Sequence, residues 1–86
     1  MVKMFLELKD TADLMNSTNY KNRFLAEYYQ TKIIYENLHK IIIKHEAGTL
    51  DFDLECPVDL LKEYARAMGH YLYMLEVRAE IENIEL

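Results

Sequence analysis

The chain has few of the residues that form disulfide bonds or glycine-rich catalytic loops. Its 86 residues include one cysteine, one proline, two glycines and no tryptophan. With Cys56 alone, no internal disulfide can form, and a single thiol is typical of a reducing cytoplasm. The two glycines are isolated, so a glycine-rich phosphate loop is absent. A chain this short buries little of its surface alone, which leaves oligomerisation as the expected means of stabilising it.

Long apolar runs are also absent. No stretch approaches the about 18 apolar residues that a membrane-spanning helix needs. The opening sequence, MVKMFLELKD, lacks the apolar core of a signal peptide. We therefore expect a soluble, cytoplasmic protein with no membrane partner.

Candidate catalytic and metal-binding residues are sparse. His39 and His45 are six residues apart, which puts their rings on opposite sides of a helix, whereas helical metal pairs are spaced three or four apart. Glu76 and Glu80 are one turn apart, a spacing found in helical magnesium phosphohydrolases, but the other long helical segment has no matching acidic pair. No serine or cysteine has the signature of a nucleophile. The sequence thus predicts a protein that is not an enzyme and that has no metal or cofactor.

The net charge of −5 is unevenly distributed. Residues 18–45 contain five basic and two acidic side chains, a local charge of +3, whereas residues 46–63 carry −5. An acidic chain argues against long DNA or RNA as a partner, because their affinity comes from many basic contacts. A small anionic ligand needs only a few lysines, although the lysines also fit the simpler interpretation of solvated surface charges.

Two long segments have the periodicity of helices. Apolar side chains recur at three- and four-residue spacing over residues 18–46 and again over residues 57–83. The second segment has one apolar stripe formed by Leu61, Ala65, Met68, Leu72, Leu75 and Ala79. It has another formed by Leu60, Ala67, Met74 and Ile81. Gly69 inside this segment suggests a close helix crossing. Two stripes on one helix indicate more than one neighbour.

The ends of these segments carry capping signals. Ser17 is the favoured N-cap of the first helix, with Asn16 as its competitor. Gly48 is expected to end that helix in the left-handed conformation. Pro57 is expected in the first turn of the second helix.

These patterns predict an all-α fold. We expect an antiparallel two-helix hairpin over residues 18–86, preceded by a short N-terminal arm over residues 1–17, and assembled as a homo-oligomer. Within the arm, residues 2–8 fit a strand or an extended segment and residues 10–15 fit one helical turn.

Tyrosine is abundant, with seven copies. A tyrosine buries a large ring while keeping a polar end, and its ring stacks well on nucleobases. Tyr29 and Lys44 lie about four helical turns apart on roughly the same side, where the lysine could meet a phosphate. Periodicity alone favours the alternative, in which tyrosines line the helix–helix core and lysines face water.

Residues 20–83 resemble families of small phage proteins. The pattern is Glu27-Tyr28-Tyr29, Leu38 and Ile41-Ile42, then Leu60-Leu61, Met68, Tyr71, Leu75 and Arg78. The run LLKEYARAMGHYLYMLEVRAEIE resembles a family named after a crAss-like phage protein and the helical-hairpin domain of anti-CBASS and anti-Thoeris sponges. Such sponges bind the cyclic nucleotide messengers of bacterial immunity without cleaving them. They are compact helical oligomers, often hexamers, with pockets between protomers.

The resemblance implies particular ligand contacts. Tyr29 and Lys44 match a tyrosine and a lysine that contact the ligand in the family, with Tyr28 and Lys40 as their neighbours if the register slips. Arg78 matches an arginine near the end of the second helix.

The chain departs from the family pattern in two places. Ile34 stands where related chains often carry an arginine, and about 18 residues precede the hairpin.

The resemblance implies a phage anti-defence sponge that sequesters cyclic di- or trinucleotides in the host cytoplasm. Tyrosines from two protomers would stack on the bases, while Lys44 and Arg78, with Lys40, would neutralise the phosphates. A helical protein–protein adaptor that inhibits or recruits a host factor is the alternative, with its exposed apolar surface against a partner helix. A magnesium phosphohydrolase using Glu76 and Glu80 is the third.

Overall fold

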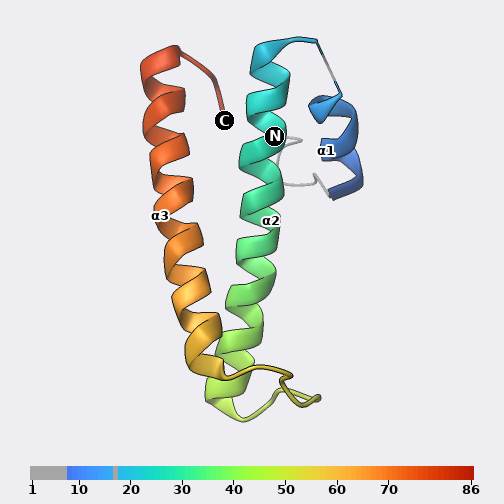
Figure 1. The fold of residues 1–86 in the computed structure, drawn as a ribbon, viewed down its shortest axis with the longest axis vertical. Helices are drawn as coiled ribbons and strands as arrows, with labels where there is room; N and C mark the ends of the chain where they lie inside the picture. The colour runs from blue at the N-terminus through green and yellow to red at the C-terminus, as the bar shows by residue number, and fades with distance from the viewer. Residues whose placement is uncertain (1–7, 17) are drawn as a thin grey trace.

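The computed structural model describes residues 8–16 and 18–86, and within them it contains helices and no strand. The three helices are α1 (Leu8–Met15), α2 (Tyr20–Ala47) and α3 (Val58–Glu82). Figure 1 shows α2 and α3 side by side and antiparallel, with α1 beside the N-terminal half of α2. The predicted all-α class is confirmed, and the two long helices form a hairpin. None of the described helices is both long enough and apolar enough to span a bilayer.

The N-terminal segment holds a helix of two turns, more than the single turn that the sequence predicts over residues 10–15. α1 begins at Leu8 and packs against α2. Thr11 is fully buried, and its Oγ1 donates a hydrogen bond to the Leu8 carbonyl at 2.6 Å. Apart from Leu8, the strand or arm expected over residues 2–8 lies outside the described residues.

α2 begins later than predicted because Asn19 is its N-cap. The Oδ1 atom of Asn19 accepts hydrogen bonds from the backbone N–H groups of Lys21, at 2.8 Å, and Asn22, at 3.4 Å. Asn16 does not cap α2, since its own N–H donates to a carbonyl of α1 and so continues that helix's hydrogen bonding. Ser17 lies outside the described residues.

The loop between the long helices begins and ends at residues with defined backbone roles. Gly48 has a φ of +75° and its N–H donates to the His45 carbonyl at 3.1 Å, which confirms the predicted left-handed end of α2. Pro57 stands immediately before α3 rather than in its first turn, with a ψ of 140°. Its carbonyl accepts from the N–H of Leu60 at 3.1 Å, so proline starts the helix from the capping position.

The core lies at the open end of the hairpin, where α2 begins and α3 ends. It is built from Phe24, Tyr28, Tyr29, Leu72, Leu75, Ala79 and Ile84. The first predicted stripe of α3 is confirmed, because four of its six members are buried and the other two are half-buried. All four members of the second stripe are exposed, so apolar surface remains outside this core.

The C-terminal tail folds back onto this core, which periodicity did not predict. α3 ends at Glu82, and Asn83 adopts a left-handed φ of 58° that asparagine tolerates better than most residues. The N–H of Ile84 then donates to the Ala79 carbonyl at 2.8 Å, and the Ile84 side chain is buried. The tail therefore covers the open end of the hairpin.

Gly69, where the sequence suggests a close helix crossing, lies beneath the Tyr35 ring, and the nearest atoms of α2 belong to that side chain. A Cβ atom at position 69 would lie 3.5 Å from Tyr35 Cε1, which is ordinary van der Waals contact. We expect Gly69→Ala to raise the free energy of unfolding by about 0.5–1 kcal/mol, because alanine has the higher helix propensity. Urea unfolding measures this, and a destabilised variant would show that the Tyr35 ring cannot accept the methyl group.

Candidate functional site

Tyr28 and Tyr29 lie in the core of the chain. Their rings are 3% and 7% exposed and meet edge to face, with centroids 5.0 Å apart. The Tyr28 hydroxyl donates to Oε2 of Glu76 on α3 at 2.7 Å. Burial raises the pKa of both phenols, and the bond to Glu76 raises the pKa of Tyr28 further. Within one chain, these tyrosines therefore help to hold α2 and α3 together.

The cations matched to phosphate binding lie at opposite ends of the hairpin. Lys40 and Lys44 are exposed on the C-terminal half of α2. Arg78 lies at the other end, with its guanidinium carbon 4.8 Å from the centroid of the Phe24 ring. The twenty residues from Phe24 to Lys44 correspond to about 30 Å of helix. A compact ligand can therefore contact Lys44 and Arg78 together only if they come from different chains.

Arg78 lines a hollow of about 430 Å³ at the open end of the hairpin. Its walls come from all three helices and consist of Met15, Tyr20, Arg23, Phe24, Glu27 and Arg78. Each of the four residues from α2 lies three or four positions from two of the others, which puts them on one side of its first turns. Antiparallel packing brings the end of α3 to the same place. Two guanidinium groups and two aromatic rings thus share one hollow.

Tyr20 and Arg78 together hold a carboxylate at the edge of this hollow. The Tyr20 hydroxyl donates to Glu82 Oε1 at 2.8 Å, and Arg78 Nε donates to Glu82 Oε2 at 3.2 Å. Arg78 also donates to the Tyr20 oxygen. The hydrogen bond from Tyr20 and then that from Arg78 lower the pKa of the Glu82 carboxyl, while the bond to Glu82 raises the pKa of Tyr20 and of Arg78. We call this pair of donors the Tyr20–Arg78 fork, and both of its members donate to the Glu82 carboxylate.

Comparison with known families identifies the hairpin. Residues 18–81 match the Sequestin family model. The chain belongs to the Sequestin family. The name indicates that its members sequester something, and it does not say what. No curated protein and no solved structure matches the chain.

The Sequestin match includes nearly all of the hollow. It covers α2 and almost all of α3, and so contains five of the six lining residues. Only Met15, which comes from α1, lies outside it. The hollow of this chain therefore lies mostly within the matched hairpin, and α1 adds one wall.

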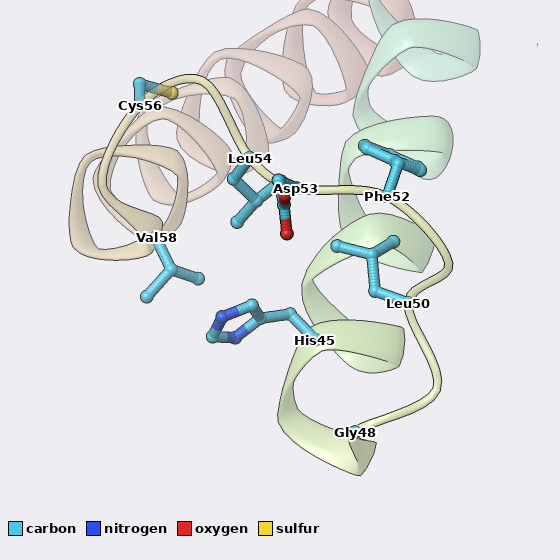
Figure 2. Close-up of a pocket in the computed structure, with 8 residues that line it drawn as sticks. All are labelled: His45, Gly48, Leu50, Phe52, Asp53, Leu54, Cys56 and Val58. Carbon is cyan, nitrogen blue, oxygen red and sulfur yellow. The ribbon is translucent and has the colours of Figure 1, made fainter.

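A second hollow, of about 500 Å³, lies at the closed end of the Sequestin hairpin. Figure 2 shows the side chains of His45 and Asp53 directed into it, with Leu50, Leu54 and Val58 around them. The Asp53 carboxylate disfavours an anion there, because the two negative charges would repel each other. The hollow beside the fork also has a carboxylate, that of Glu27, but its two arginines outweigh this charge and make it the better candidate for an anionic ligand.

One of the two carboxylates considered for magnesium, that of Glu76, has a partner within the chain. Glu76 accepts the Tyr28 hydrogen bond across the hairpin. Within residues 8–16 and 18–86, no group of three or more His, Cys, Asp or Glu side chains is placed to hold a metal ion.

Sequence reasoning missed Tyr20 and Arg23. The available signal was local: both belong, with Phe24 and Glu27, to one side of the start of the first long helix. Their partner on α3 is set by the packing of the two helices, which the spacing did not specify.

We expect Tyr28→Phe to lower the free energy of unfolding by about 1 kcal/mol, because it removes the hydroxyl that donates to Glu76 while keeping the ring. Tyr73→Phe is the matched control, since Tyr73 is 61% exposed. Denaturant unfolding measures both variants. Equal losses in the two would contradict a bracing role for the Tyr28 hydroxyl.

Proposed function

We propose that this chain binds cyclic di- or trinucleotides and sequesters them without cleaving them, as a phage anti-defence sponge in the host cytoplasm. The observation that carries the proposal is the Tyr20–Arg78 fork, which holds a carboxylate beside a hollow lined by Arg23 and Phe24. Membership of the Sequestin family supports sequestration. The resemblance to anti-CBASS and anti-Thoeris sponges supports the class of ligand.

In this mechanism a phosphate replaces the Glu82 carboxylate on the fork. A guanidinium group presents parallel N–H donors that match phosphate geometry, and Phe24 beneath Arg78 holds that group by a cation–π contact. Arg23 adds a second positive charge to the same hollow. A ligand with two phosphates needs few cations, which makes the net charge of −5 tolerable.

Tyr28 and Tyr29 are buried, so we expect the base to stack on Tyr20, whose side chain is 49% exposed. Tyr28 and Tyr29 then support the site indirectly, through the helix packing. Lys40 and Lys44 join the phosphates from a neighbouring protomer, since both are exposed and lie far from Arg78 in their own chain. The functional form in this proposal is a homo-oligomer with its pockets between protomers.

Isothermal titration calorimetry with a panel of cyclic di- and trinucleotides tests the ligand. We expect Arg78→Gln to weaken binding at least tenfold, because a charge-assisted hydrogen bond to phosphate is worth about 1.5–3 kcal/mol. Glu82→Gln should strengthen binding, because no carboxylate then competes for the fork. Arg66→Gln is the matched control, since Arg66 is exposed on α3 outside the hollow.

Several outcomes would overturn these expectations. The absence of heat with every ligand at about 100 µM would remove the nucleotide proposal. Equal weakening by Arg66→Gln would remove the fork from it. Mass spectrometry of the recovered ligand should show it intact, and cleavage products would contradict sequestration without turnover.

The exposed second stripe of α3 favours one other function, a protein–protein adaptor. Its members Leu60, Met74 and Ile81 are 55%, 45% and 74% exposed. A pull-down from host extract separates the two proposals: a stoichiometric protein partner supports the adaptor, and a co-purifying small molecule that absorbs ultraviolet light supports the sponge.

A further inference from the structure

α3 has an apolar face that none of the described residues covers. Seven residues, spaced alternately four and three apart, run along the whole helix: Leu60, Tyr64, Ala67, Tyr71, Met74, Arg78 and Ile81. We call this set the outer stripe. All seven are exposed, and the large apolar and tyrosine side chains among them range from 36% exposure at Tyr71 to 74% at Ile81.

The spacing of the outer stripe is that of a coiled-coil interface. Alternation of four and three gives a repeat of 3.5 residues, which keeps one line of side chains facing a partner helix. The residues that pack against α2 form a separate face. Tyr71, for example, is turned about 100° from its buried neighbour Leu72. The helix is therefore built to have two neighbours, of which the chain supplies one.

We infer that the outer stripe packs against the outer stripe of a second copy of this chain, with the two α3 helices antiparallel. From Leu60 to Ile81 the stripe has a length of about 32 Å. A partner must carry the same repeat over the same length, and α3 itself meets that requirement through a two-fold contact. Five large exposed side chains supply apolar contact area along this length.

Charge selects the antiparallel arrangement. A parallel pair would bring Arg78 next to Arg78 of the second copy, two like-charged groups that each already pair with their own Glu82 and gain no partner from the contact. An antiparallel pair centred on Gly69 places Arg78 opposite Leu60 of the second copy, within one turn of the acidic Asp59 and Glu63. The two helix dipoles also oppose each other in this arrangement, which is favourable.

Side-chain size is consistent with the same register. The small Ala67 lies opposite the large Tyr71 of the second copy, so that one makes room for the other. Tyr64 lies opposite Met74, whose thioether makes favourable contacts with aromatic rings. Each tyrosine of the stripe therefore packs against a residue other than tyrosine.

Light scattering coupled to size-exclusion chromatography tests the contact without any nucleotide. We expect the wild-type mass to be an even multiple of 10.3 kDa. Tyr71→Glu should reduce the assembly to smaller species while circular dichroism keeps its helical signal, because two carboxylates would be buried in the pair. Tyr73→Glu is the matched control, since Tyr73 is a more exposed tyrosine outside the stripe and should leave the mass unchanged. Met74→Glu repeats the test if Tyr71→Glu does not fold.

Single cysteines in a Cys56→Ser background test the orientation. Position 70 flanks the stripe and is only two residues, about 3 Å, out of register with position 70 of the second copy, so His70→Cys should form a disulfide-linked dimer. Positions 64 are ten residues out of register, about 15 Å, so Tyr64→Cys should not.

A monomeric wild type, or an assembly that Tyr71→Glu leaves intact, would overturn the contact. Crosslinking of Tyr64→Cys in place of His70→Cys would overturn its antiparallel direction. A monomeric wild type would also contradict the homo-oligomer of the proposed function, whereas loss of the α3 contact or of its direction leaves ligand binding itself to be measured separately by the calorimetry.

Discussion

The packing of aromatic side chains from α2 against aliphatic side chains from α3 at the open end of the hairpin sets the register of the two helices. Tyr28 and Tyr29 meet Leu72 and Leu75 in one buried cluster. Each such buried side chain contributes about 1.5–3 kcal/mol, and the long helices have no covalent link besides one loop. A slip of one turn, about 5.4 Å, would carry Arg78 away from the start of α2. The hollow and the fork both depend on that register.

Arg78 lies where two surfaces of the molecule meet. Its guanidinium group belongs to the fork and covers Phe24, and its position in α3 also belongs to the outer stripe. A second copy packed on that stripe would bring its own helix start to the rim of the hollow. The surface for assembly and the site for ligand binding would then lie next to each other on α3. A domain too small to enclose a ligand can thus obtain the missing wall from a neighbour.

The sequence predicts the long helices well because their signal is local. Spacing of apolar residues and the preference of glycine for positive φ specify α2, α3 and the turn at Gly48 without knowledge of the rest of the chain. Other features depend on tertiary contacts. α1 needs the side of α2, and the tail beyond Asn83 needs the core that it covers.

The candidate site was less predictable than the fold for the same reason. Tyr28 and Tyr29 carry no local mark that separates a buried tyrosine from one that meets a ligand. The partnership of Tyr20 with Arg78 joins residues 58 positions apart, which only the hairpin register can bring together. Arg78 was predicted from a family resemblance, and the chemistry around it became visible only in three dimensions.

The backbone turn after α3 determines how easily the fork can change its occupant. Glu82 is the last residue of the helix, and two residues later Ile84 is anchored in the core. Under the proposed function, an incoming anion would therefore displace one side chain while the backbone beneath it stays in place. The released glutamate would regain rotamer freedom worth up to about 2 kcal/mol, which would partly offset the hydrogen bonds it gives up. Such an exchange would require little reorganisation, so an empty protomer would already be close in shape to a loaded one.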